Sequence, residues 1–257
     1  STAKVWRLLA LAEIPWAEHA EYTGRLIRQV KRLMFTGTAF SLSGQDDGVL
    51  PCYNAMIASS LIRLGDHESG VAASIEWIMH YQPFDRATRT GWCGASSRKY
   101  GGCFKAVPCY IGLVKSARAL QLYNRRAHDP AHDLAIEATL DRALDYILSH
   151  RLAWRLSADE PITGHILDLS FPQSYHLNIV ELLQLVYDAG RIDDPRVAHA
   201  LDYVRSKRKN DGSWRINFRY KAEGYMSFDE RGGPAQWLTH ILSGILPESP
   251  GDRDTGE

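Results

Sequence analysis

Neither sign of charge dominates this chain, and no segment is apolar for long enough to cross a membrane. Its 257 residues carry 30 lysines and arginines against 30 aspartates and glutamates. Because the chain lacks a basic block, it has no electrostatic footprint for nucleic acid, and we expect no nucleic-acid partner. The apolar runs fall short of the about 20 residues that a membrane-spanning helix needs, so we expect no transmembrane segment.

Cysteine is scarce, and no stretch shows the alternating pattern of a half-buried strand. Four cysteines among 257 residues do not make a disulfide scaffold. We therefore expect reduced thiols in a cytoplasmic protein, with peripheral membrane contact as a further expectation. Cys93 and Cys103 flank a glycine-rich stretch, and we interpret them as loop thiols. The missing strand alternation, together with widespread helical periodicity, predicts an all-α fold.

Two short sequence motifs recur along the chain at intervals of 57 to 69 residues. A period of this size indicates stacked copies of one supersecondary unit rather than one irregular fold. The first motif is amphipathic, and the second motif begins with proline. The first motif occurs at Ile75–Ile78, Leu144–Ile147 and Leu201–Val204. The second motif occurs at Pro51–Ile57, Pro108–Val114 and, more loosely, Pro172–Leu177.

Apolar and amphipathic helices alternate in this pattern. The alternation predicts an α/α toroid, or α/α barrel, of about four to five hairpins, with an apolar inner ring and an amphipathic outer ring, closed or incomplete. We expect one domain over 1–257, with the repeats at 17–246 and a flexible tail at 247–257. The expected helices are 3–13, 17–34, 51–65, 69–82, 106–124, 131–151, 172–190, 195–208 and 233–246, with long loops at 91–102 and 210–233.

Two motifs resemble signatures of a known superfamily. Lys209–Trp214 reads Lys-Asn-Asp-Gly-Ser-Trp and resembles the Asp-Gly-Ser-Trp signature of terpenoid (squalene-type) cyclases. Gly101–Tyr110 is similar to the Gly-Gly-Phe loop and Asp-x-Cys-Tyr helix start of protein prenyltransferase β subunits. The resemblance implies the α/α-toroid fold that these families share. It also implies that Trp214 caps a helix end and ties neighbouring hairpins together.

In those β subunits the aspartate and cysteine bind zinc, and the histidine of a Tyr-His pair completes the protein ligands. Cys109 matches the cysteine and Tyr175–His176 match the pair, but Val107 stands where the aspartate would be. Cys52 holds the place of Cys109 in the preceding repeat. We therefore predict a zinc site of Cys52, Cys109 and His176, since zinc favours thiolate and imidazole ligands. Alternatively, both cysteines are small residues packed at helix starts.

The acid motifs of terpenoid chemistry are absent. The chain has neither the Asp-x-Asp-Asp that protonates an alkene nor the Asp-Asp-x-x-Asp that holds magnesium and diphosphate. Asp168 precedes the third apolar helix, where it is a candidate acid and a further zinc ligand. We predict Asp168 and His176 as catalytic residues. Asp229 is a second candidate acid at the cavity mouth. Loop or capping roles are the alternative for Asp168 and Asp229, and Asp193-Asp194-Pro195 predicts a helix cap.

Aromatic residues recur at the starts of the apolar helices. Tyr53, Tyr110, Tyr175 and Trp237 are predicted to bind substrate, because aromatic rings around an apolar cavity stabilise a carbocation through cation–π contacts. The alternative is that they pack helix ends. Four basic residues predict either a solvated outer helix face or a site for diphosphate. They are Arg25, Arg28, Lys31 and Arg32.

The resemblance implies an enzyme of the terpenoid cyclase or prenyltransferase type. We expect it to act on an isoprenoid or other hydrophobic substrate in a central cavity, with zinc as a possible aid. The alternative is a non-catalytic toroid that binds a lipid or a partner protein, which the missing acid motifs favour. A prenyltransferase-like role implies an α-type partner, and an incomplete ring implies a second chain, so we expect a homo- or hetero-oligomer.

Overall fold

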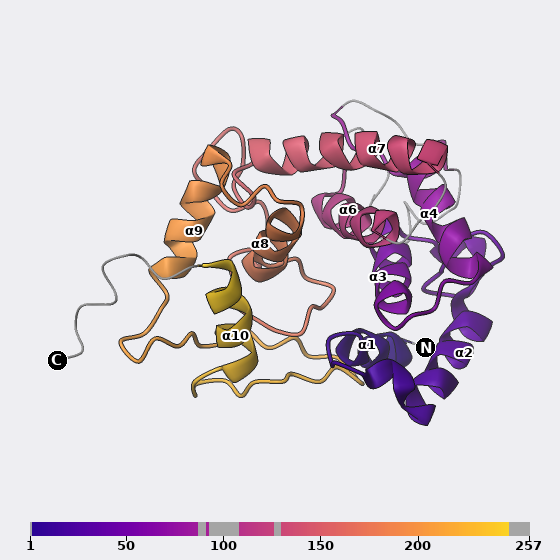
Figure 1. The fold of residues 1–257 in the computed structure, drawn as a ribbon, viewed down its shortest axis with the longest axis horizontal. Coiled ribbons are helices and arrows are strands. Elements are labelled where there is room, and N and C mark those ends of the chain that lie inside the picture. The colour runs from indigo at the N-terminus through magenta and orange to yellow at the C-terminus, as the bar shows by residue number, and fades with distance from the viewer. Residues whose placement is uncertain (1, 87–90, 93–107, 126–129, 247–257) are drawn as a thin grey trace. The chain divides into compact units, whose positions relative to one another are not determined.

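A computed structural model describes residues 2–86, 91–92, 108–125 and 130–246 (Figure 1). These residues form nine α-helices and no strand, which confirms the all-α prediction. The chain divides into two compact units. The first comprises Ser1–Ile147 with Lys221–Met226, and the second comprises Leu148–Tyr220 with Ser227–Glu257.

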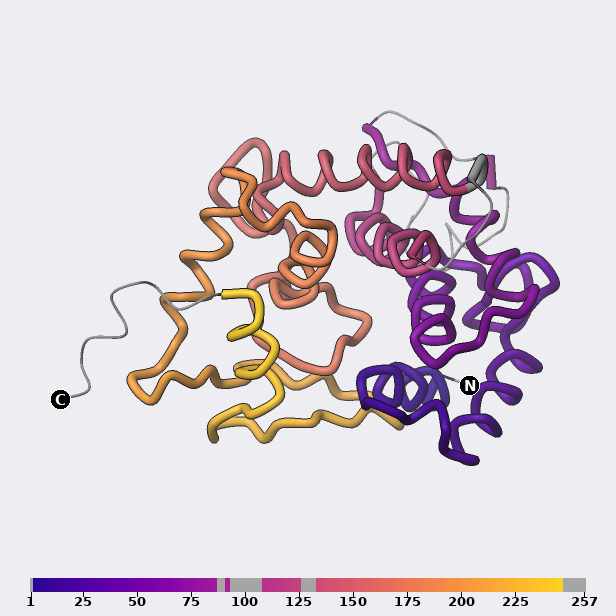
Figure 2. Tube along the Cα trace, in the orientation of Figure 1, coloured from indigo at the N-terminus to yellow at the C-terminus, as the bar shows by residue number. Residues whose placement is uncertain are grey.

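The first unit contains the helices of the N-terminal repeats, and its apolar helices contact one another directly. Helix α3 packs most extensively on α6, and α4 packs on both, while α1 covers α2 and α3 (Figure 2). This arrangement places apolar helices against apolar helices, as the repeat pattern predicts. The helices are α1 (Thr2–Leu11), α2 (Glu21–Met34), α3 (Pro51–Arg63), α4 (Ser69–Tyr81), α6 (Tyr110–Asn124) and α7 (Pro130–Ser149), whose last residues belong to the second unit.

Close packing between α3 and α6 forms the core of the first unit. Ile57, Leu61, Leu113 and Leu120 are fully buried, and each such side chain contributes about 1.5–3 kcal/mol relative to an exposed one. Gly112 permits the close approach, because a Cβ there would lie 3.1 Å from Cβ of Pro51. A larger residue at position 112 would therefore push the two helices apart.

The second unit has fewer helices, and Trp214 joins two of them. Its helices are α8 (Ile179–Asp188), α9 (Ala198–Arg205) and α10 (Gln236–Ile245), with α8 packed on both of the others. Trp214 is 1% exposed, and its Nε1 donates to the carbonyl of Val204 at 2.8 Å, near the end of α9. Its backbone N–H donates to Thr239 Oγ1 on α10, and its carbonyl accepts from Ala235. Trp214 thus caps α9 and ties it to α10, the role that the resemblance implies.

The predicted start of the third apolar helix is wrong. Helix α8 begins at Ile179 rather than near 172, so Pro172–Leu177 forms a loop. Asn178 fixes this start, because its Oδ1 accepts from the backbone N–H of Glu181 at 3.0 Å. Such an Asn-x-x-Glu pattern is a helix-start signal in its own right.

The other helices lie where the periodicity predicts them, with shifted ends. Helix α2 begins at Glu21 after a 3₁₀ turn at Ala17–His19, and α6 begins at Tyr110, after the proline at 108. Residues 206–235 contain no helix or strand, as expected for a long loop. Most of the 91–102 loop, with Cys93 and Cys103, and the 247–257 tail lie outside the described residues. The ring-shaped arrangement of hairpins stays a prediction.

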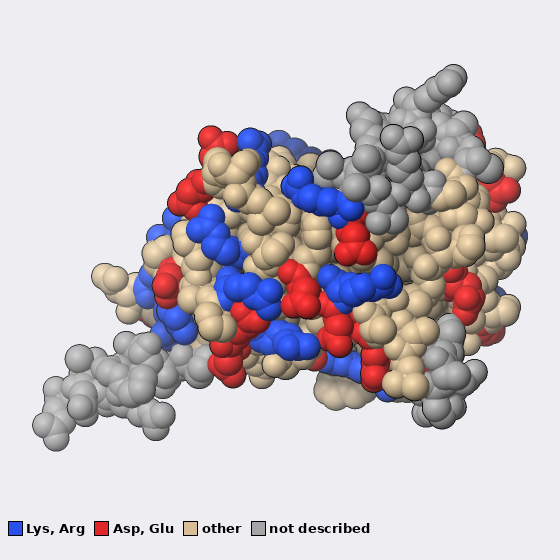
Figure 3. All heavy atoms as spheres, turned by 90° about the horizontal axis from the view of Figure 1, so that it is seen from above, with Lys and Arg blue, Asp and Glu red and all other residues tan. Residues whose placement is uncertain are grey.

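The surface fits the neutral composition of the chain. On the face seen in Figure 3, basic and acidic side chains are intermixed, and no large region carries a single sign. No helix among the described residues is long and apolar enough to span a bilayer.

We expect Trp214→Phe to lower the free energy of unfolding by about 1–3 kcal/mol, because phenylalanine keeps a ring in the core but loses the hydrogen bond to Val204. Urea denaturation followed by circular dichroism measures the change. The matched control is Trp16→Phe, because Trp16 is 77% exposed and lies outside the core. Equal stability of the two variants would contradict the role assigned to Trp214.

Candidate functional site

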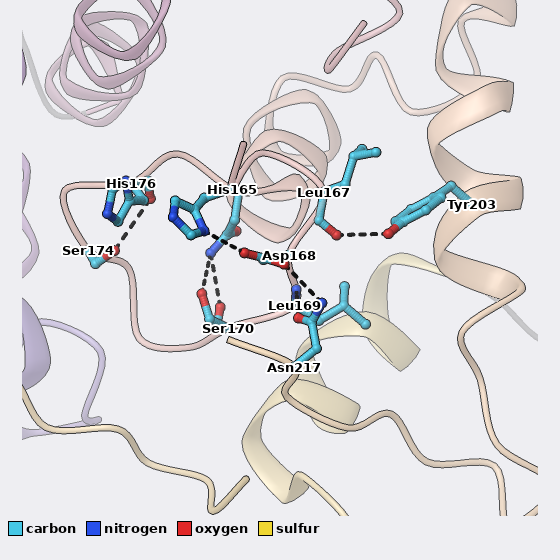
Figure 4. Close-up of polar contacts among 10 residues, drawn as sticks. His165, Leu167, Asp168, Leu169, Ser170, Ser174, His176, Tyr203 and Asn217 are labelled. Carbon is cyan, nitrogen blue, oxygen red and sulfur yellow. Dashed lines mark hydrogen bonds and ion pairs between the residues drawn. The ribbon is translucent and has the colours of Figure 1, made fainter. Parts of the chain in front are cut away.

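A histidine–aspartate pair lies in the loop before α8, in the second unit (Figure 4). The distance from His165 Nδ1 to Asp168 Oδ2 is 2.8 Å, and the side chains are 40% and 21% exposed. A carboxylate only accepts hydrogen bonds, so the Nδ1 proton of His165 points to Asp168. This leaves Nε2 as the nitrogen with the lone pair, which is the arrangement of an oriented general base.

Asn217 holds the aspartate from the other side. Its Nδ2 donates to Asp168 Oδ1 at 2.9 Å, and its Oδ1 accepts from the N–H of Leu169 at 2.7 Å. The backbone N–H of Asn217 also donates to the carbonyl of Leu169 at 3.2 Å. Tyr203 on α9 adds a fourth contact, from its hydroxyl to the carbonyl of Leu167 at 3.0 Å. Both carboxylate oxygens of Asp168 are therefore engaged, and its orientation is fixed.

Aromatic rings surround the imidazole of His165. Its ring centroid lies 4.2 Å from that of Phe218 and 4.4 Å from that of His176. His176 in turn lies 5.4 Å from Tyr220 and 5.6 Å from Tyr175. The pair thus adjoins a set of ring faces that suits an unsaturated or apolar ligand.

Two tyrosines near the pair remain protonated into alkaline solution. Burial raises the pKa of Tyr203, and the charge on Asp168 raises it further. Burial also raises the pKa of Tyr220. Both hydroxyl groups therefore keep their protons at neutral pH and are poor candidates for a base there.

The structure connects Asp168 and His176, both predicted from the sequence, through His165, which was not predicted. His165 contacts the carboxylate of one and the ring of the other. The spacing His-x-x-Asp was a local signal for the pair. No such signal marks Asn217 or Phe218, because they come from a segment far along the chain.

The two predicted cysteine ligands lie in the first unit. Cys52 is 2% exposed in the first turn of α3, and Cys109 is half-buried just before α6. Burial, with a smaller contribution from the charge of Cys109, raises the pKa of Cys52 to about 12, while Lys115 acts in the opposite sense. Zinc binds the thiolate form, so burial without a metal opposes the form that a ligand must take.

His176, the third predicted ligand, belongs to the second unit. Among the residues that the structure describes, no three His, Cys, Asp or Glu side chains form a group suited to a metal ion. The zinc set of Cys52, Cys109 and His176 stays a prediction, and we assign no chemical step to zinc.

The predicted substrate-binding aromatics have different surroundings. Tyr53 and Tyr110 are buried in the first unit, with ring centroids 6.0 Å from Trp6 and 6.5 Å from Tyr146. Trp237 stacks on Phe171 at 6.2 Å in the second unit. Tyr175 adjoins His176 and is half-buried. Of these four, Tyr175 is the one that borders the ring set around His165.

Asp229 and Asp194 are both capping residues. Asp229 accepts from the backbone N–H groups of Trp237 and Leu238 at 3.1 and 3.0 Å, which caps the start of α10. Asp194 accepts from the N–H of Arg196 at 2.9 Å. The capping alternative is therefore correct for Asp229, and the cap predicted at Asp193-Asp194-Pro195 is confirmed.

Comparison of the chain with protein-family models, with curated proteins and with solved structures found no match in any of the three. The assignment of a function therefore rests on the residues and their geometry.

We expect Cys52 to resist alkylation by iodoacetamide at pH 8 in the native protein and to react once the chain is unfolded. Burial and the pKa of about 12 keep it as an inaccessible thiol. Peptide mass spectrometry measures the modified fraction, with half-buried Cys109 as the internal control that reacts sooner. Modification of both cysteines at the same rate would show that Cys52 is accessible.

Proposed function

We propose that this protein is an enzyme in which His165, oriented by Asp168, transfers a proton at a hydrophobic substrate. The observation that carries the proposal is the 2.8 Å hydrogen bond between His165 Nδ1 and Asp168 Oδ2. An imidazole held this way takes a proton at Nε2, while the carboxylate stabilises the imidazolium that forms. Asn217 keeps the carboxylate in place by its own hydrogen bond.

The rings beside His165 support a substrate that is apolar or unsaturated. The ring of Phe218 lies near His165, and the ring of Tyr220 lies near His176. The faces of such aromatic rings stabilise a transient carbocation intermediate. By the resemblance to terpenoid cyclases and prenyltransferases, the substrate class is an isoprenoid. In that chemistry His165 would remove a proton from the carbon beside a cation. The electrons of the broken C–H bond would become the new alkene bond.

Zinc assistance is a separate part of this proposal. Metal content of the purified protein and of a Cys109→Ala variant, measured by plasma mass spectrometry, tests it directly. Near-stoichiometric zinc that the variant loses would support the Cys52, Cys109 and His176 set. Absence of zinc from the wild-type protein would remove that set and leave the proton-transfer role of His165 unaffected.

We expect His165→Gln to lower turnover by roughly 10²–10⁴-fold, because glutamine cannot accept the proton. Asp168→Asn should also lower turnover, since an amide no longer favours the Nδ1–H form of His165 or stabilises the imidazolium. The assay follows squalene and farnesyl diphosphate by gas chromatography and mass spectrometry. His240→Gln, an exposed histidine on α10, is the matched control.

Steady-state kinetics separate a catalytic role of His165 from a structural one. A catalytic His165 predicts that His165→Gln lowers kcat far more than it changes KM, while thermal unfolding of that variant stays close to wild type. If His165→Gln turns over substrate at the wild-type rate, the catalytic assignment is wrong. A wild-type protein that binds lipid without turnover would instead support the non-catalytic alternative.

A further inference from the structure

An apolar turn projects from the first unit between α1 and α2 (Figure 2). Its residues are Ile14, Pro15 and Trp16, which are all exposed, with Trp16 at 77% and Ile14 at 39%. The turn is well fixed, because the carbonyl of Ile14 accepts from Ala17 at 3.2 Å and that of Trp16 accepts from His19 at 3.1 Å. Buried Ala17 anchors it to the unit. The exposed indole is thus held outward by a defined backbone.

Two costs accompany this turn. Trp16 has a φ of 61°, in the left-handed region that residues other than glycine rarely adopt. Its large apolar side chain also remains mostly in water, so it does not contribute the free energy that its burial would provide. A strained backbone that displays a tryptophan is an observation that points to a function for the displayed side chain.

Helix α2 follows this turn in the chain and carries basic side chains on its exposed face. Arg25, Arg28 and Arg32 are exposed and follow helical spacing, so they form one stripe, the arginine stripe. Tyr22 and Leu33, at 44% and 43% exposure, lie at the two ends of the same helix.

Two of the three arginines of this stripe form no ion pair with the described residues. Arg25 pairs with Glu21, but Arg28 and Arg32 make no hydrogen bond or ion pair with any residue that the structure describes. Lys31, the fourth basic residue of α2, is not part of the stripe. It binds Asp66 at 3.0 Å and also Glu68.

We propose that the Ile14–Trp16 turn and the arginine stripe of α2 bind the surface of a bilayer that contains anionic phospholipid. Tryptophan and tyrosine favour the headgroup level of a membrane, where an apolar ring meets a polar layer. Basic side chains beside them are attracted to the phosphates of the same layer. A projecting apolar turn that is followed in the chain by two arginines without ion pairs matches this boundary better than it matches the flat, well-packed core of a protein interface. The proposal is independent of the proposed function, because it uses other residues.

The test is co-sedimentation of the full chain with vesicles of phosphatidylcholine, with and without phosphatidylglycerol. We expect binding that requires phosphatidylglycerol and weakens as salt is added. Trp16→Ser should lower the partition coefficient roughly tenfold, because the indole no longer enters the headgroup layer. Replacing Arg25, Arg28 and Arg32 together by glutamine should lower it by roughly a hundredfold, at about fivefold for each charge.

Matched controls change similar side chains elsewhere. Leu156→Ser removes another exposed apolar residue, 54% exposed in the second unit, and should bind like wild type. A triple glutamine variant of Lys209, Arg219 and Arg231, all exposed, removes the same charge from the second unit. Trp16→Gly is the control for a folding defect. Glycine favours the left-handed backbone, so the free energy of unfolding of this variant should be unchanged or higher than that of the wild type. Its binding to vesicles should still be weak, because the indole is absent.

Three results would overturn the proposal. They are failure of the wild-type protein to bind either vesicle, equal binding of Trp16→Ser and Leu156→Ser, and equal loss in both triple variants. If vesicles do not bind but Trp16→Ser dissociates a dimer in sedimentation velocity, the turn contacts a second copy of the chain and the lipid assignment is wrong.

Discussion

The pairing of Asn217 with Asp168 and Leu169 is the constraint on which the geometry of the second unit depends. One amide side chain bonds to a carboxylate and to a backbone N–H, and the backbone of Asn217 adds a third bond to Leu169. Each bond contributes only about 1 kcal/mol net. Together the three bonds align two segments that lack regular secondary structure, so that His165 contacts both its carboxylate partner and its aromatic neighbours. Asp168 is therefore at once a structural residue and the group that orients the base.

The second unit shows how a chain with little regular structure keeps a fixed shape. Backbone groups outside helices and strands must find other partners when they are buried. Here side chains supply them: Asn178 caps α8, Asp229 caps α10, and Trp214 closes α9. Each of these side chains is itself nearly buried, which strengthens the bond and raises the cost of losing it. The loop that carries His165 consequently leads into a capped helix, α8.

Periodicity predicted the helices well because burial imposes it. Helices α3 and α6 are apolar on almost every side since each is surrounded by other helices, and this pattern is visible in one sequence. The loose repeat at Pro172–Leu177 predicts too early a start for α8, because Asn178 carries the capping signal of this helix. The His-x-x-Asp spacing is a local signal for the pair of His165 and Asp168, but it lies outside the repeats. No local pattern predicts the contacts with Asn217 and Phe218, because these residues lie about fifty positions further along the chain.

The zero net charge of the chain hides a local imbalance with physical consequences. In the first unit the acids are used in pairs: Glu13 binds Arg63, Glu21 binds Arg25, and Asp66 binds Lys31. Arg28 and Arg32 remain outside these pairs among the described residues. Charges more than about 8–10 Å apart are largely screened at physiological salt, so an approaching surface responds to the nearest charges rather than to the total. Neutral composition argues against a broad basic face of the kind that nucleic acid requires. It does not argue against a short contact with an anionic surface at α2, the helix that carries Arg28 and Arg32 and follows the exposed Trp16 in the chain.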